Sequence, residues 1–500
     1  MSEKLDQFKT LLAEVADLNN VQELLGWDQQ TYMPQGGAEA RGNQLATIGK
    51  ISHQKFTSDE IGILLGDLEK EFEGADPDSD DLRLLKVTRH DYDQATRVPA
   101  EFVAEFAVVT SKAFEAWMEA REKSDFAIFQ PHLEKVVELN QRYVSFFPPA
   151  DHPYDVLLDQ FERGMKTADV KAIFEALRPQ QVELLKAIAE KSQVDDSFLH
   201  VEYDEKTMWD FSEVIATKFG YDWERGRQDK AAHPFTTNFS INDVRITTRF
   251  EVDNPTVMLF STMHETGHGL YELGSKQSYE RTPLAGGASL AVHESQSRMW
   301  ENLVGRSLPF WEHFYPEFQK LFPAQVGNVD LDTFYKGLNK VESSLIRVNA
   351  DEATYNMHIM LRLELEIDMV EGAVAVKDLP EIWNAKMEEY LGILPPDDAK
   401  GVLQDIHWAY GSMGYFSTYA LGNLISAQLW EKITTDIPDL SEQFRVGEFG
   451  ALLEWLREKI HMHGSKYEPQ ELVQRVTGSK IDSAAYVRYL KQKYSDIYGL

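Results

Sequence analysis

Two histidines four residues apart, with a glutamate directly after the first, stand in the segment STMHETGHGLYELG at residues 261–274. On a helix, His264 and His268 lie on one face roughly 6 Å apart, so both imidazoles can reach one metal ion. Glu265 is rotated by about 100° around the helix axis, where its carboxylate can accept a proton from water without binding the metal itself. This arrangement is typical of zinc hydrolases and predicts Glu265 as the general base and acid.

A hydrolytic zinc site also needs a third protein ligand and one open position. Glu272 lies on the histidine face, but eight residues of helix place it about 12 Å from His264, too far to share one ion. Another class of zinc peptidase has a histidine six residues after the second ligand, where this chain has Gly274, a residue suited to end the helix. The third ligand is therefore expected outside this helix.

A second amphipathic helix is predicted over residues 290–305, after a loop and with Ser289 as its N-cap. Its candidate ligands are His293, Glu294 and Glu301. Local chemistry favours Glu294 and leaves His293 as the alternative, because either side chain can bind zinc and only one of two neighbours can face it.

The composition restricts the partners and the metal chemistry. The 500 residues include 82 Asp and Glu against 50 Lys and Arg, a formal net charge of −32, which argues against nucleic acid or an anionic membrane as partner. There is no cysteine, so histidine and carboxylate groups must hold any metal. We expect a cytoplasmic protein, since the N-terminal segment has no signal-peptide core and no window is apolar over a membrane-spanning length.

Apolar residues recur at helical spacing along most of the chain and predict a mainly α fold. Interruptions at residues 73–81, 146–153, 391–401 and 435–441 indicate loops, with helical patterns on both sides of each. We therefore expect one large helical domain over residues 1–500.

The segment FTTNFSINDVRITTRFEV at residues 235–252 differs, because its β-branched and aromatic residues predict a β-hairpin just before the zinc helix. Asn242 and Asp243 are expected in its turn. Such a strand could pair with an extended peptide substrate or be only structural, and the pattern leaves both interpretations open.

A polar stripe is predicted on one helix over residues 346–366. Its members recur at steps of three or four residues: Arg347, Asp351, Tyr355, His358, Arg362 and Glu366. The residues alone favour a solvated face with ion pairs of Arg347 with Asp351 and of Arg362 with Glu366. The alternative is a groove lining in which an arginine binds a substrate carboxylate.

Hydrogen-bonding aromatic residues gather among glycines at residues 401–423, including His407, Tyr415 and Tyr419. Side chains of this kind suit a substrate-facing wall that stabilises a tetrahedral oxyanion. His233, in the HPF segment before the hairpin, is a further polar candidate, although a loop histidine without a role is equally compatible with the pattern.

Together these motifs resemble the carboxypeptidase Taq family of thermostable metallocarboxypeptidases. The matching segments, in the order of the family, are HPF at 233, DVRIT at 243, HETGH at 264, HESQ at 293, IRVNAD at 346 and GVLQDIHW at 401, with LGWDQQTYMP at 25–34 similar to the N-terminal motif. The resemblance implies release of single residues from peptide C-termini with broad specificity, using zinc or sometimes cobalt. It also implies a deep groove in a helical fold similar to the neurolysin and angiotensin-converting-enzyme group, and a homodimer.

By matching position, the resemblance implies metal ligands His264, His268 and Glu294, with Glu265 as base and acid. It implies His407 and Tyr415 as transition-state contacts. Substrate-binding candidates are Arg347 for the terminal carboxylate, with Arg245, Arg249 and Arg362 as alternatives, together with His233 and Tyr419. Ser417 stands where proline is expected, which affects the placing of Tyr415 and Tyr419. The competing hypotheses are a zinc endopeptidase or oligopeptidase with an open groove, and a helical scaffold with an inert zinc helix.

Overall fold

The helical periodicity of the sequence is realised along most of the chain. The computed structural model describes residues 2–500 and has 67% helix with a small β-sheet, which confirms the mainly α prediction. Among the described residues, no helix combines the length and apolar character needed to cross a membrane.

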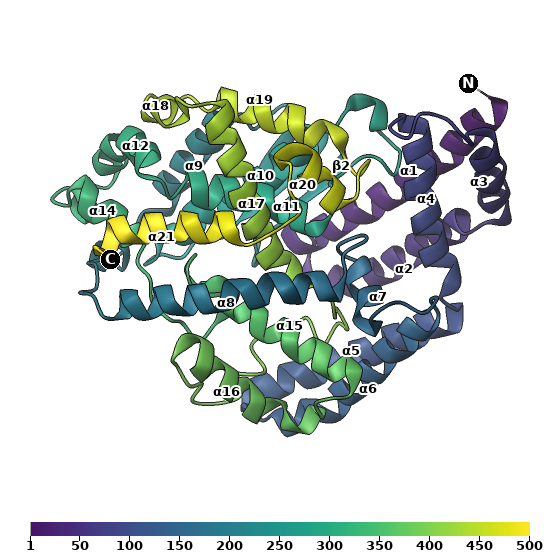
Figure 1. Cartoon of the computed structure of the whole chain (residues 1–500), viewed down its shortest axis with the longest axis horizontal. Helices are drawn as coiled ribbons and strands as arrows, with labels where there is room; N and C mark the ends of the chain where they lie inside the picture. The colour runs from purple at the N-terminus through teal and green to yellow at the C-terminus, as the bar shows by residue number, and fades with distance from the viewer. Residues whose placement is uncertain (1) are drawn as a thin grey trace.

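The N-terminal helices have a small hydrophobic cluster of their own. They are α1 (Glu3–Thr31), α2 (Ala38–Phe56), α3 (Asp59–Glu71) and α4 (Asp80–Arg97). Apolar side chains of α1, α3 and α4 meet Tyr279 and Leu284, which come from the loop after α10 (Pro255–Leu273). Figure 1 shows these helices in purple at one end of the molecule, far from the C-terminus.

A larger core joins the remaining elements. The helices before the sheet are α5 (Ala100–Lys123), α6 (Phe126–Ser145), α7 (Pro153–Asp159), α8 (Thr167–Ala189) and α9 (Glu205–Phe219). Those after it, besides α10, are α11 (Leu290–Arg298), α12 (Leu308–Leu321), α13 (Pro323–Val326), α14 (Leu331–Leu338), α15 (Tyr355–Glu371), α16 (Leu379–Leu391), α17 (Ser417–Asp436), α18 (Leu440–Arg445), α19 (Gly450–Lys459), α20 (Pro469–Thr477) and α21 (Ala484–Tyr498).

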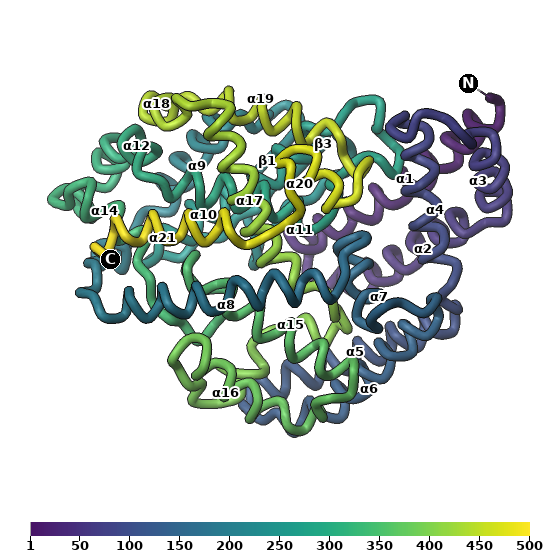
Figure 2. The backbone as a smooth tube through the Cα atoms, in the orientation of Figure 1, coloured from purple at the N-terminus to yellow at the C-terminus, as the bar shows by residue number. Residues whose placement is uncertain are grey.

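Contacts within this core join parts of the chain that are distant in sequence. The long helices α8 and α21 contact each other and run side by side across the molecule (Figure 2). Short 3₁₀ turns complete the structure at Gln35–Gly37, Ser197–Leu199, Gln277–Tyr279, Arg347–Asn349, Val376–Asp378 and His461–His463. Because the N-terminal helices have a separate cluster, the single domain over residues 1–500 stays a prediction.

Within the described chain, three strands form the sheet in the order β1-β3-β2, with β2 at an edge. The predicted hairpin is β2 (Thr236–Ser240) and β3 (Asp243–Thr248), which pair antiparallel with Thr237 opposite Arg245. The sequence did not predict β1 (Gly226–Lys230), which pairs parallel to β3. Its residues GRQDK are polar and do not alternate with apolar ones, so no strand pattern marks it.

The helix α10, which carries His264, Glu265 and His268, has clear signals at both ends. The Asn254 side chain caps its N-terminus by accepting from the Thr256 N–H, and Gly274 follows its last residue. In its middle, a Cβ at Gly267 would lie 2.7 Å from the carbonyl oxygen of Gln296, so glycine at this position lets α10 and α11 approach closely.

The predicted helix over residues 290–305 is present, although its winding changes along its length. The Ser289 hydroxyl accepts from the Val292 N–H and caps α11, as predicted. After Arg298 the helix continues as a π-helical segment, Met299–Val304. Segments of this kind are rare and are frequent at functional sites.

The prediction of one solvated helix over residues 346–366 is wrong. Arg347 lies in a separate 3₁₀ turn, and α15 begins only at Tyr355. The side chains of Arg347, Arg362 and Glu366 are all buried. The apolar periodicity correctly predicted that one side of α15 is buried, but the polar side also packs against protein.

Candidate active site

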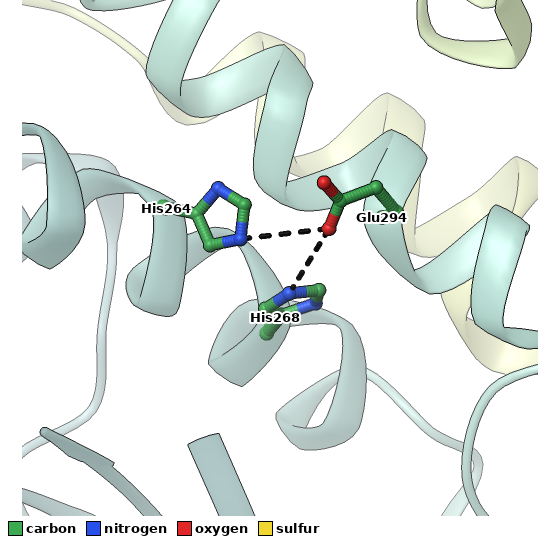
Figure 3. A group of neighbouring side chains, drawn as sticks. All are labelled: His264, His268 and Glu294. Carbon is green, nitrogen blue, oxygen red and sulfur yellow. Dashed lines mark ion pairs between the residues drawn. The ribbon is translucent and has the colours of Figure 1, made fainter. Parts of the chain in front are cut away.

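Three potential metal ligands converge where α10 meets α11. Glu294 Oε2 lies 3.5 Å from Nε2 of His264 and 3.6 Å from Nε2 of His268. Figure 3 draws both contacts as dashed lines. One ligand atom from each residue falls within 4.8 Å of the other two. A tetrahedral zinc ion with ligands at about 2.1 Å separates them by about 3.4 Å, so these spacings fit one ion.

Each of the two histidines has a hydrogen-bonding partner on the far side of its ring. His264 Nδ1 lies 2.8 Å from Glu301 Oε2, and His268 Nδ1 lies 2.7 Å from His293 Nδ1. His293 Nε2 in turn lies 2.6 Å from Glu272 Oε1. With the Nε2 atoms turned to a metal, the Nδ1 atoms carry the protons, and these partners fix the tautomer and orientation of both rings.

The three candidate ligands on the second helix therefore take different places. Glu294 is in the ligand group, whereas His293 and Glu301 stand behind the two histidines. Glu272, which spacing excluded as a ligand, accepts a hydrogen bond from Asn238 Nδ2 at 2.8 Å and so connects β2 to this network. A cavity of about 470 Å³ between α1, β2 and the loop at residues 280–286 borders Glu272 and Asn238.

Glu265 is buried beside this group, with 5% of its surface exposed. The Thr236 hydroxyl of β2 donates to Glu265 Oε2 at 2.6 Å, which fixes the carboxylate. Burial raises the pKa of Glu265 above its ordinary value. A carboxyl group that binds a proton more readily than usual suits a general base that later acts as an acid.

A buried carboxyl group outside the ligand set positions α11. Glu162, in the segment between α7 and α8, accepts from the Ser289 hydroxyl at 2.8 Å and from the Ala291 N–H at 3.1 Å. Burial raises the pKa of Glu162 to about 8. The group is thus mostly protonated at neutral pH in the folded protein, where it caps the helix that carries Glu294.

Glu162→Gln is expected to make stability less sensitive to alkaline pH. The folded pKa lies above the unfolded value of about 4.5, so the contribution of Glu162 is complete below pH 4.5 and is lost as pH rises through about 8. This pH-dependent part is on the order of a few kcal/mol. Thermal unfolding between pH 5 and pH 9 measures it: the decline should be shallower in the variant. Equal declines in the wild type, Glu162→Gln and the exposed control Glu175→Gln would contradict the assignment.

A buried ion cluster joins the two polar motifs at residues 346–351 and 401–408. Arg347 donates from Nε and Nη2 to Asp405 Oδ1 at 3.0 and 2.9 Å, and Arg362 Nε donates to Asp405 Oδ2 at 2.6 Å. Burial opposes ionisation of Asp405, but the two guanidinium groups outweigh it and hold the pKa of this carboxyl well below its usual range.

The ion pairs expected along the 346–366 stripe do not form. Asp351 instead accepts from the Thr354 hydroxyl at 2.9 Å, and Glu366 accepts from Trp408 Nε1 at 2.8 Å. Both arginines pair with Asp405, which lies more than 40 residues further along the chain. The stripe is therefore an interior network and not a solvated face.

The aromatic candidates gather next to this cluster. The ring of Tyr415 lies 5.2 Å from that of His407 and 5.3 Å from that of Tyr419, and the Arg347 guanidinium lies 5.0 Å from the Tyr419 ring. Ser417 begins α17 and donates to the Gly414 carbonyl at 3.3 Å, so the turn is formed without proline.

The same helix α17 also reaches the ligand group. A Cβ at Gly422 would lie 2.6 Å from the Cβ of Glu294, so α17 packs directly against α11. Tyr419 stands three residues before Gly422, close to one turn away on α17. The aromatic cluster and the ligand group therefore lie on neighbouring parts of one site.

Two further substrate-binding candidates, His233 and Arg245, lie outside the ligand group and the aromatic cluster. His233 is exposed in the loop before β2. Arg245 pairs with Asp243 through two hydrogen bonds of 2.9 Å, and its guanidinium lies 4.4 Å from the ring of Trp27 and 4.7 Å from that of Phe239. This packing joins α1 to the sheet, and the substrate roles of His233 and Arg245 stay predictions.

Sequence reasoning did not find Thr236, Glu162 or Arg298. Arg298 donates from Nε to Glu294 Oε1 at 2.7 Å. Its spacing of four residues after Glu294 was the available signal. Thr236 and Glu162 reach the site through tertiary contacts only, and no local pattern marks them.

The arrangement of His264, His268 and Glu294, with Glu265 beside them, is typical of a metallohydrolase. A family model described as carboxypeptidase Taq (M32) metallopeptidase matches residues 7–494. The chain is 40% identical over 496 residues to thermostable carboxypeptidase 1 of Thermus thermophilus, with 97% of each chain covered. It is 36% identical over 498 residues to carboxypeptidase 1 of Bacillus subtilis, with 99% of this chain and 98% of that protein covered.

A solved structure described as an M32 carboxypeptidase from Deinococcus radiodurans R1 is similar with a TM-score of 0.97 and 39% identity, with 100% of both chains covered. The chain therefore belongs to the carboxypeptidase Taq (M32) metallopeptidase family. It is a metallocarboxypeptidase, a peptide hydrolase that depends on a divalent metal. This confirms the resemblance inferred from the motifs, and the oligopeptidase alternative is not favoured.

Proposed function

We propose that His264, His268 and Glu294 hold the divalent metal of this carboxypeptidase and that Glu265 is its general base and acid. The observation that carries the proposal is the convergence of the three ligand atoms within 4.8 Å, with Glu265 on the adjoining helix position. The donor set supports zinc, because two imidazoles and one carboxylate with an open fourth position are typical of catalytic zinc sites. Cobalt can occupy the same donors.

When bound, the metal supplies a Lewis acid that polarises the scissile carbonyl and makes water a stronger acid. Glu265 removes a proton from that water and delivers it to the leaving amine. The Thr236 hydroxyl occupies Glu265 Oε2, so we assign the proton transfer to Oε1. Tyr415 and His407 are assigned to the tetrahedral oxyanion, with support from their place beside α17 and Arg347.

A carboxypeptidase must also bind the terminal carboxylate of its substrate, and we assign this role to Arg347. The Arg347 side chain makes three hydrogen bonds to described residues, two to Asp405 and one to the Tyr355 hydroxyl. These bonds use three of the five N–H groups of the guanidinium. Arg362 is less suitable because it is fully buried and burial lowers its pKa. Tyr419, against which Arg347 packs, is assigned to the same subsite.

Arg347→Lys is expected to lower kcat/KM on peptides with a free C-terminus by about 10- to 100-fold, because a lysine cannot reproduce a two-bond contact with a carboxylate. The measurement compares each peptide with its C-terminally amidated form. The wild type should strongly prefer the free form, and the variant should lose most of that preference. Arg178→Lys, which alters an ion pair with Glu364 elsewhere, is the control. An unchanged preference in Arg347→Lys would remove Arg347 from this role.

We propose four further features on the family resemblance. They are a deep groove similar to that of the neurolysin and angiotensin-converting-enzyme group, a homodimer, broad specificity for the terminal residue, and a cytoplasmic location. The cavity that borders Glu272 supports the proposed groove, because it leaves room for a peptide beside the edge strand β2. Equilibrium sedimentation tests the homodimer, and a digest of a peptide ladder read by mass spectrometry tests stepwise release of single residues.

A further inference from the structure

Arg298 connects two carboxylates at the junction of α11 and the π-helical segment. Its Nε donates to Glu294 Oε1 at 2.7 Å, and its Nη1 donates to Glu301 Oε2 at 3.0 Å. The carbon at the centre of the guanidinium lies 4.6 Å from the centre of the Tyr355 ring, which supports one face of the group. Arg298 is thus held on three sides, and 15% of its side chain is exposed.

The two oxygens of Glu294 consequently have different surroundings. Oε2 faces Nε2 of His264 and of His268 at 3.5 and 3.6 Å and also accepts from the Ser297 hydroxyl at 3.1 Å. Oε1 points to Arg298 instead. The carboxylate therefore offers one oxygen to the ligand group, while the arginine holds the other.

Arg298 also acts on His264 through Glu301. The carboxylate oxygen that accepts from Arg298 Nη1 is the same Oε2 that lies 2.8 Å from His264 Nδ1. Glu301 Oε2 is thus shared between the guanidinium and the imidazole, and it orients the ring of His264. One guanidinium thus contacts one ligand directly and a second ligand through one intermediate.

We propose that Arg298 is a positioning residue that limits Glu294 to coordination through one oxygen and fixes the orientation of His264. This inference rests on the proposed ligand set. A carboxylate can bind a metal through one or both oxygens. Without Arg298, Oε1 is free to turn toward the metal and to take the position that water and the peptide carbonyl need. The planar, forked guanidinium suits this role because it donates to two carboxylates at once, which a lysine ammonium on one flexible stem does not reproduce.

The test uses the full chain loaded with Co²⁺, whose visible absorption is stronger in four-coordinate than in five- or six-coordinate sites. Arg298→Lys and Arg298→Met are expected to bind Co²⁺ still, with a weaker visible band and a value of kcat lower by about 10- to 100-fold. Arg83→Lys and Arg83→Met are matched controls, because Arg83 also bridges two carboxylates, Asp78 and Glu471, but lies on α4. The controls should keep the wild-type band and kcat.

Circular dichroism identifies the variants that fold. If Arg298→Met does not fold, Arg298→Lys, which retains the positive charge, still provides the test. A wild-type band in folded Arg298 variants, with or without weaker Co²⁺ binding, would overturn the proposal. The proposed ligand set fails separately: in that case His268→Ala would keep the wild-type Co²⁺ band, whatever Arg298 does.

Discussion

Glu265→Gln is expected to keep the metal and to lose about 10²- to 10⁴-fold in kcat, the range that general acid–base catalysis contributes. Glutamine is close in shape to glutamate and can still meet the Thr236 hydroxyl, so the site should remain assembled. An amide, however, cannot accept a proton from water or pass one to the leaving amine. Metal analysis and steady-state kinetics on a single peptide measure the two effects together.

Glu364→Gln is a suitable control for this experiment, since Glu364 is a partly buried glutamate on α15 that pairs with Arg178 and Lys386 outside the site. Its kcat should stay close to that of the wild type. If Glu265→Gln retained most of its turnover with metal bound, Glu265 would not be the base. If it lost the metal, the residue would belong to the ligand set instead.

His268→Ala is expected to lose both the metal and the activity. Removing one of the three proposed ligands leaves a site with only two, and catalytic zinc sites use three. Added zinc should raise the melting temperature of metal-free wild type, since a ligand at 100 times its Kd adds about 2.7 kcal/mol of stability. The variant should show no such shift. His200→Ala, at an exposed histidine paired with Asp196, is the control and should respond as the wild type does.

Activity after chelation gives a second readout for the same prediction. The wild type and His200→Ala should lose activity in a chelator and recover it when zinc or cobalt is restored. His268→Ala should stay inactive throughout. Recovery of His268→Ala at ordinary metal concentrations would show that another group completes the site.

The sequence was sufficient for the part of the site that one helix determines. His264, Glu265 and His268 lie within five residues, and helix geometry alone sets their relative directions. The choice between His293 and Glu294 was harder, because neighbouring residues point in different directions and the rotation of α11 decides which faces α10. Tertiary contacts set that rotation, among them Gly267 against Gln296 and Gly422 against Glu294.

Long-range contacts explain what the sequence analysis missed. The 346–366 stripe has the periodicity of a surface helix, and periodicity cannot show that a second layer of protein covers the polar side. Asp405, which pairs with both Arg347 and Arg362, is remote in sequence, so the local i, i+4 pairs were assigned in its place. Similarly, β1 is recognisable only by its pairing with β3.

The ligand set is tested most directly by crystals of the metal-loaded enzyme, with anomalous diffraction measured on either side of the absorption edge of the bound metal. We expect one strong peak at about 2.1 Å from Nε2 of His264, Nε2 of His268 and Oε2 of Glu294. Glu294 Oε1 should remain with Arg298. A peak bound by His293, or a peak away from these three side chains, would contradict the proposed ligand set.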